Sequence, residues 1–357
     1  MESPVRVYMG KATRLGASTS VQEAITRIKS LIDDGEPLFT KKELHAVREQ
    51  LRKVQGKEDG QKIFVKGLDG VAVEFAIETG NTHRSPLPGY EFIVQKPCIE
   101  YVPMQDLISS LWNRNPDVAY CNLRIYHYRV LRNISTKQLC DTQAMMSKNE
   151  TEIFFQTHSQ VWRASEPCKQ LRSTLLSKGC VTNIRKVVGF ALGSIASNDR
   201  PDLFTSPSTA SAFQHSLILT LRDVLCEREG ERREDILCYV QDPMYTDIDK
   251  SILESSGIDI LDDPEAFLQV DDAAIVVSCA PNVPVKQIVS DLARPVVMIW
   301  DRIGDREEDP PGTDPDSSRL RDLIRNHYEE IEFLGDGQNF RDLAVYIYRS
   351  DVSSTGR

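Results

Sequence analysis

The sequence predicts an α/β fold, with a doubly wound, mostly parallel, Rossmann-like sheet in its C-terminal half and a smaller α+β region before it. Three observations lead to this prediction. The strands expected after residue 180 are apolar throughout, helical segments separate them, and the first of them leads into a glycine-containing turn. Strands that are apolar on both sides are typical of parallel sheets whose two faces are covered by helices.

Length and composition exclude several classes of protein. The chain has 357 residues, of which 40% are hydrophobic and 27% charged, so it can form two domains with substantial cores. Its formal net charge of -10 disfavours nucleic acids and anionic membranes as partners, because both attract positive charge. The sequence shows neither an apolar run long enough to span a membrane nor a signal peptide. We therefore expect a cytoplasmic protein; the nucleus is expected as a second compartment only through a resemblance of the second half of the chain to a known family.

The cysteines are spread along the chain. There are eight of them, and no two lie closer than 12 residues apart. This spacing excludes paired C-x-x-C zinc knuckles, and reduced, buried thiols are expected in a chain without a signal peptide. We predict no metal site.

We expect two segments in the first part of the chain. Residues 1–36 are expected to be a flexible N-terminus, in which residues 21–32 can form one amphipathic helix, and residues 37–175 an α+β region. Thr40 and Glu43 form a capping box for a helix. Further extended runs are expected at residues 63–66, 71–78, 90–94, 98–102 and 123–131, and a helix at 104–112, with a glycine hairpin turn at 67–70.

Residues 176–350 are expected to form the parallel sheet domain. Strands are expected at residues 184–188, 236–240, 258–261, 273–277 and 295–300, and helices at 212–225, 249–255 and 320–331. Residues 304–318 are acidic and rich in proline, which is typical of a solvated loop. Residues 339–348 alternate between apolar and polar, which suits a final strand that can be antiparallel.

The turn after the first parallel strand is the leading candidate for a binding site. It reads Ala191-Leu192-Gly193-Ser194-Ile195-Ala196, which departs from G-x-G-x-x-G/A at its first glycine. Glycines at this point allow close approach of a ligand, and the following helix N-terminus favours anions. We predict that Gly189, Gly193 and Ser194 contribute to a cofactor site. The alternative is a glycine-containing turn that binds nothing.

Two further candidates follow later strands. Asp242 comes after the second strand, where dinucleotide-binding folds place an acid on the ribose hydroxyls, although 49 residues separate it from Gly193 instead of about 20. Alternatively, Asp242 only caps a turn. Cys279 follows the fourth strand, and we predict that it lines the cofactor cleft together with Gly193, Ser194 and Asp242. Its thiol is either a nucleophile or soft metal ligand or, as is commoner, a packing residue.

Other patterns favour structural roles. Residues 123–131 interleave basic and aromatic side chains, but this alternation also suits a half-buried strand, and the acidic net charge disfavours nucleic acid. His215 has no second ligand at helical spacing, so a surface or hydrogen-bonded histidine is expected. No G-x-S-x-G, H-E-x-x-H, Walker or kinase motif occurs, and no catalytic residue is predicted.

The second half, over residues 175–350, resembles the Sensitivity-to-Red-light-Reduced family. The matching segments are residues 191–197, 239–246 and 277–284, and residues 314–321 resemble a segment of fungal relatives. Family members often carry glycine where this chain has Ala191. Many also carry P-H-C where this chain has Ser278-Cys279-Ala280, so no histidine-dependent role is carried over.

The resemblance implies a regulatory or ligand-sensing protein, because the family is associated with light and circadian signalling and with haem or tetrapyrrole homeostasis. Protein partners and a small molecule in the C-terminal cleft are expected, with S-adenosylmethionine or haem as candidate cofactors. The expected sheet is also that of class I methyltransferases. An S-adenosylmethionine-dependent methyltransferase is therefore the alternative, in which Gly193 approaches the methionine moiety and Asp242 the ribose. A non-catalytic interaction scaffold is a second alternative.

Overall fold

The chain divides into two compact units. The computed structural model describes residues 5–56, 60–140, 144–179, 183–197, 208–230, 232–304 and 312–349. One unit comprises Met1–Thr142 with Pro311–Pro315, and the other Gln143–Pro310 with Asp316–Arg357. The boundary expected between residues 175 and 176 therefore moves to residue 142. The reason is that two helices before residue 178, α4 (Lys148–Ala164) and α5 (Glu166–Ser177), pack on α6 (Thr209–Glu229) of the second unit.

The N-terminal unit contains two antiparallel sheets. The first has the order β1 (Val5–Tyr8), β7 (Leu123–Asn133), β6 (Tyr90–Tyr101), β5 (Thr82–Arg84), and the second β2 (Ala12–Arg14), β4 (Ala72–Ala76), β3 (Lys62–Lys66). The expected hairpin is confirmed as β3 and β4. The two strands expected at residues 90–94 and 98–102 form one strand, β6, whose register shifts between Val94 and Pro97.

Short helices complete the N-terminal unit: α1 (Val21–Asp33), α2 (Lys41–Val54), α3 (Met104–Leu107) and the 3-10 turn η1 (Pro116–Val118). Thr40 caps α2 as expected. The amphipathic helix expected at residues 21–32 is confirmed as α1, which buries Ala24 and Ile28. α3 is shorter than expected and ends at Leu107, whose carbonyl accepts a hydrogen bond from the Asn113 side-chain amide in place of a further helical turn.

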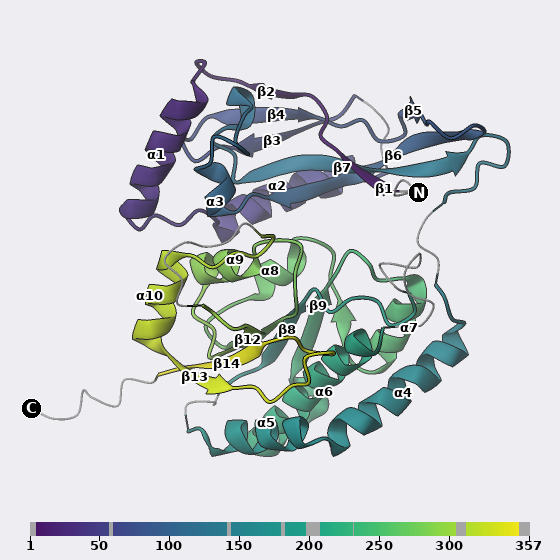
Figure 1. Ribbon diagram of the computed structural model, residues 1–357, viewed down its shortest axis with the longest axis vertical. Helices are drawn as coiled ribbons and strands as arrows, with labels where there is room; N and C mark the ends of the chain where they lie inside the picture. The colour runs from purple at the N-terminus through teal and green to yellow at the C-terminus, as the bar shows by residue number, and fades with distance from the viewer. Residues whose placement is uncertain are drawn as a thin grey trace, which may run out of the picture. The chain divides into compact units, whose positions relative to one another are not determined.

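The C-terminal unit contains one large, mostly parallel sheet, which makes it a mixed α/β unit (Figure 1). The strand order is β10-β9-β8-β11-β12-β14-β13. Its strands are β8 (Lys186–Phe190), β9 (Leu237–Gln241), β10 (Asp259–Ile260), β11 (Ala274–Ser278), β12 (Val297–Asp301), β13 (Tyr328–Glu332) and β14 (Leu343–Tyr348). The first five in this list run parallel, as expected, and β14 pairs antiparallel with both β12 and β13.

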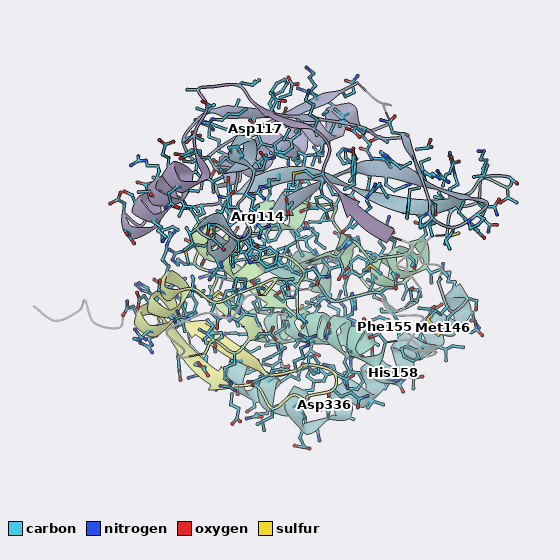
Figure 2. The ribbon with its side chains drawn as sticks, turned by 45° about the horizontal axis from the view of Figure 1, so that its top comes forward. Arg114, Asp117, Met146, Phe155, His158 and Asp336 are labelled. Atoms are coloured by element: carbon cyan, nitrogen blue, oxygen red, sulfur yellow. The ribbon has the colours of Figure 1, made fainter. Side chains whose placement is uncertain are left out.

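Helices cover this sheet. In Figure 1, α4, α5 and α6 lie together along one side of it, and Figure 2 labels Phe155 and His158 of α4, of which Phe155 joins the core. The remaining helices are the 3-10 turn η2 (Arg233–Asp235), α7 (Asp247–Ser255), α8 (Glu265–Gln269), α9 (Val285–Leu292) and α10 (Ser318–His327). The helix expected at residues 320–331 ends at His327, because the next residues pair with β14 as the strand β13.

Two sequence expectations concern loops and membranes. Residues 305–311 of the expected acidic loop lie outside the described residues, whereas residues 304 and 312–317 form neither helix nor strand. None of the described helices has the length and apolarity needed to cross a bilayer.

Candidate functional site

The candidate site lies where the order of the parallel strands reverses. β9 lies on one side of β8 and β11 on the other. Ligands of open α/β sheets bind outside the carboxyl ends of the strands at such a point. The segments that follow these three strands are residues 191–197, 242–246 and 279–284, which are the segments that the sequence singled out. We call residues 191–197 the β8 turn.

The backbone of the β8 turn is strained at its start. Ala191 has a φ of 55° and Gly193 a φ of 70°, in the left-handed region that favours glycine. A Cβ atom on Gly193 would lie 2.6 Å from Ser211 Oγ of α6. Glycine is therefore favoured at position 193, whereas the alanine at 191 is held in a conformation that costs about 1 kcal/mol or more.

Asp242 lies beside Gly193. The Gly193 amide donates to Asp242 Oδ2 at 2.8 Å, and the Met244 amide donates to Oδ1 at 2.9 Å. The structure thus brings together two residues 49 positions apart, because β8 and β9 are parallel neighbours. The carboxylate caps both the β8 turn and its own turn after β9, which is the alternative role that the sequence left open for it.

A second carboxylate, Asp249 of α7, occupies the middle of the β8 turn. The amides of Ile195 and Ala196 donate to its Oδ1 at 2.8 and 3.0 Å, and Ser194 Oγ donates to Oδ2 at 2.6 Å. Thr246 donates to Oδ2 through its amide at 2.8 Å and its hydroxyl at 2.7 Å. Asp249 is fully buried. Successive backbone amides that bind anions in other proteins therefore bind the chain's own carboxylate here.

Ser194 is engaged on both sides of its hydroxyl. Besides donating to Asp249, Ser194 Oγ accepts a hydrogen bond from the Ser197 amide at 2.9 Å. A hydroxyl has one proton to donate, and that proton already serves Asp249. Ser194 therefore holds the β8 turn in its folded form.

His215 and Tyr245 form a buried pair next to this network. His215 Nδ1 lies 2.6 Å from the Ser211 carbonyl oxygen, and Nε2 lies 2.8 Å from the Tyr245 hydroxyl. Because a carbonyl only accepts, Nδ1 carries the proton and the tyrosine donates to Nε2. Burial lowers the pKa of His215 to about 4 and raises the pKa of Tyr245 well above its ordinary value. The expectation of a hydrogen-bonded histidine is confirmed.

Gly189 lies within β8, before the turn. A Cβ atom there would lie 2.9 Å from Leu192 Cδ1 and 3.1 Å from both Ile218 Cδ1 and Val240 Cγ1. Gly189 thus allows α6 and β9 to pack closely on β8. The structure gives it a packing role in the strand, in place of the expected role in a cofactor turn.

Cys279 belongs to the hydrophobic core of the C-terminal unit. Burial raises the pKa of its thiol far above the ordinary value, and the Asp301 carboxylate raises it further. A thiol is reactive as its thiolate, which this environment disfavours. The structure therefore supports the packing role for Cys279.

Two observations on the described residues concern the expected cofactors. No group of three or more metal-binding side chains occurs in the described ranges. Both ring nitrogens of His215 are engaged in hydrogen bonds, and burial raises the pKa of the Cys279 thiol and so disfavours the thiolate that binds haem iron. A pocket of about 10 Å³ beside α5 and a second one along α1 include no residue of the candidate site.

Sequence reasoning missed Asp249, and it gave no role to Tyr245 and Thr246 although both lie in a segment that it singled out. Thr246 and Asp249 form the capping box of α7, a pattern that is visible in the sequence but predicts only a helix start. The contact between Asp249 and the β8 turn depends on the pairing of β8 with β9, which brings α7 next to residues 194–196.

The geometry defines an α/β domain whose strand-end turn is closed by carboxylates of the same chain. The model of the SRR1 domain matches residues 168–347, and the chain belongs to the SRR1 domain family. None of the curated proteins matches the chain. Among solved structures, it is similar to an O-methyltransferase family protein from Burkholderia thailandensis, with 10% identity and a TM-score of 0.28. That similarity covers 52% of this chain and spans 57% of the other.

Proposed function

We propose that this chain is a regulatory protein that acts by binding other molecules, without catalysis at the β8 turn. The observation that supports this proposal most strongly is the hydrogen bonding of the Asp249 carboxylate. Its buried carboxylate accepts the hydrogen bonds of Ile195 and Ala196 that an anionic cofactor group would need. A second negative charge at this point would be repelled, and displacing Asp249 would leave a buried charge without partners.

Family membership supports the regulatory part of this proposal. We place the protein in light or circadian signalling or in haem homeostasis, in the cytoplasm or the nucleus and with protein partners, because the family is associated with these processes. Within this proposal the C-terminal unit acts as an interaction scaffold. Its assignment to the fungal branch of the family stays a prediction from residues 314–321.

The competing function is an S-adenosylmethionine-dependent methyltransferase, and two observations favour it. The parallel strands have the order β10-β9-β8-β11-β12, which suits a doubly wound, Rossmann-like sheet with a ligand at the reversal point. Asp242 also lies at the end of the second strand, beside Gly193. In this function Asp242 would exchange its bonds to backbone amides for bonds to a ribose.

Thermal unfolding with added ligands separates the two functions. The full chain is melted with S-adenosylmethionine, S-adenosylhomocysteine, NAD or haemin, and Asp242→Asn is melted alongside. A ligand at about a hundred times its dissociation constant adds roughly 2.7 kcal/mol. We expect no shift with the adenosyl compounds or NAD, and a shift with haemin alone would add a ligand-sensing role. A shift with S-adenosylmethionine that Asp242→Asn loses would overturn the proposal in favour of the methyltransferase.

A further inference from the structure

We propose that β13, the outer strand of the seven-stranded sheet, is a docking site for an extended segment of a partner protein. The segment pairs with β13 as an additional strand and carries alternating basic and apolar side chains. This inference concerns a different part of the C-terminal unit from the β8 turn, and it holds whether or not that turn binds a cofactor. Figure 1 shows β13 next to β14 at the margin of the sheet.

The register shows which backbone groups of β13 face outward. The Arg349 amide donates to the His327 carbonyl at 2.8 Å, so these two residues form a hydrogen-bonded pair. Such pairs alternate along an antiparallel ladder, which makes Glu329 with Ile347 and Ile331 with Val345 the next ones. The amide and carbonyl groups of Glu330 and Glu332 therefore point away from β14. Among the described residues they have no hydrogen-bond partner.

Another edge strand of the same length, β3, has its outward backbone groups hydrogen-bonded by a side chain. β3 is also five residues long and lies at the edge of its sheet. There the Gln50 side-chain amide donates to the Phe64 carbonyl and accepts from the Phe64 amide, both at 2.8 Å. The remaining edge strands β1, β2, β5 and β10 have two to four residues. Among the residues that the structure describes, none caps β13 in this way, and β13 contains neither a proline nor a register shift.

The negative charge of the glutamates on β13 favours a positively charged partner segment. Glu329, Glu330 and Glu332 are all exposed. Glu329 pairs with Lys178 and Glu330 with Arg302, whereas Glu332 has no ion-pair partner among the described residues. A second copy of β13 in an antiparallel pair would set glutamates against glutamates, which is unfavourable. A segment with lysine or arginine side chains is complementary to this edge, so we commit to a basic partner.

The two faces of the edge differ in polarity. On the face toward α5, Ile331 lines a small cavity of about 10 Å³ together with Leu171 and Thr174 of α5 and with the strand-end residues Glu332, Phe333 and Leu334, and Leu334 is 48% exposed. Glu329 shares the face of Ile331 and is paired with Lys178, whereas Glu330 and Glu332 alternate to the opposite face. In strand addition, main-chain hydrogen bonds supply affinity and alternate side chains supply specificity. Alternating apolar and basic side chains match the two faces.

The test measures binding of a short, capped peptide of alternating lysine and valine to the full chain. A control peptide replaces every valine by proline, which keeps the charge but prevents strand pairing. We expect the valine peptide to bind at least about tenfold more tightly than the proline peptide. We also expect it to slow hydrogen exchange at the Glu330 and Glu332 amides. Equal binding of the two peptides, no binding of either, or unchanged exchange at these amides would overturn the proposal.

Variants of Glu332 sharpen the test. Glu332→Pro removes an outward amide that the β13–β14 ladder does not use, so the fold should survive. We expect it to weaken peptide binding about tenfold, and Glu332→Gln, which removes only the charge, to weaken it a few-fold. Glu254→Gln on α7 is the matched control and should bind as the wild type. If Glu332→Pro binds normally, strand pairing is contradicted; if it unfolds, the exchange at Glu330 in the wild type decides.

Discussion

The two halves of the carboxyl edge of the seven-stranded sheet differ in how their ionisable side chains are surrounded. At the ends of β8 and β9, two carboxylates are saturated with hydrogen bonds from backbone amides and hydroxyls. At the ends of β11 and β12, burial raises the pKa of both Cys279 and Asp301, and Asp301 has like charges nearby at Asp316 and Asp342. The first half is fixed by its own carboxylates, whereas the second half contains groups whose ionisation costs free energy.

This difference predicts which substitutions lower the free energy of unfolding of the C-terminal unit and which raise it. A buried carboxylate is stabilised when donors surround it, and removing it then leaves those donors without partners. A half-buried carboxylate with few donors is a cost that a neutral side chain removes. Substitutions in the two halves should therefore have opposite signs.

The largest effect should come from Asp249→Asn. The asparagine nitrogen cannot accept hydrogen bonds, so it faces the donors of Ser194 and Thr246 and leaves them unpaired. We expect a loss of about 3 kcal/mol in the free energy of unfolding, measured by urea denaturation. The control is Asp247→Asn, because Asp247 lies on the same helix with a fully exposed side chain. This variant should change the free energy of unfolding by less than about 0.5 kcal/mol. Equal effects of the two variants would remove the special role of Asp249.

Lowering the pH should destabilise the C-terminal unit, because it protonates His215 beside the β8 turn. Its pKa is about 4 in the folded chain and 6.5 ordinarily, so the folded state resists protonation. The stability due to the neutral ring is complete above pH 6.5 and is lost as the pH falls toward 4, amounting to roughly 3 kcal/mol. We expect His215→Gln to unfold with a smaller pH dependence over this range. A pH dependence equal to that of the wild type would show that folding leaves the pKa of His215 unchanged.

The backbone of the β8 turn gives the next effect. Gly193→Ala introduces a side chain at a φ of 70° and sets its Cβ 2.6 Å from Ser211 Oγ. We expect a loss of about 2 kcal/mol in unfolding free energy. Gly230→Ala has a φ of 66° but no atom within 4 Å of the new Cβ, so it should lose only about 1 kcal/mol. If the two losses are the same, the turn is less tightly packed against α6 than the structure shows.

The smallest effect should have the opposite sign and lie in the second half. Burial raises the pKa of Asp301, although Lys286 and Arg341 oppose the shift. Because the folded pKa is above the ordinary one, ionisation weakens the folded state once the pH exceeds 3.8. Asp301→Asn should therefore raise the melting temperature slightly at pH 7 and leave it unchanged near pH 3. A lower melting temperature at pH 7 would show that Asp301 is stabilised by its cationic neighbours.

The sequence predicted most of the sheet because its signals are local. Five parallel strands follow from short apolar runs, and Thr40 marks the start of a helix. β13 was missed because the helical period of α10 runs on into residues 328–331, and only pairing with β14 makes them extended. The sequence predicted no helix where α4 and α5 lie, and residues up to 175 were kept with the N-terminal region, since packing of these helices on α6 is a contact distant in sequence.

The candidate site was predictable only in part. The proximity of Gly193 and Asp242 follows from two adjacent parallel strands and needs no knowledge of side chains. The carboxylate inside the β8 turn did not follow, because the sequence presents Asp249 as an ordinary residue of a helix capping box. Gly189 and Cys279 were expected to serve a ligand, but their neighbours in the folded chain are core side chains.

The most direct test of the account is hydrogen exchange at the Ile195 and Ala196 amides, measured on the full chain with and without excess S-adenosylmethionine. Amides that donate to a buried carboxylate exchange slowly. We expect both amides to be protected in the free protein and unchanged by the ligand. Rapid exchange in the free protein that becomes slow only with S-adenosylmethionine would contradict the closure of the β8 turn by Asp249.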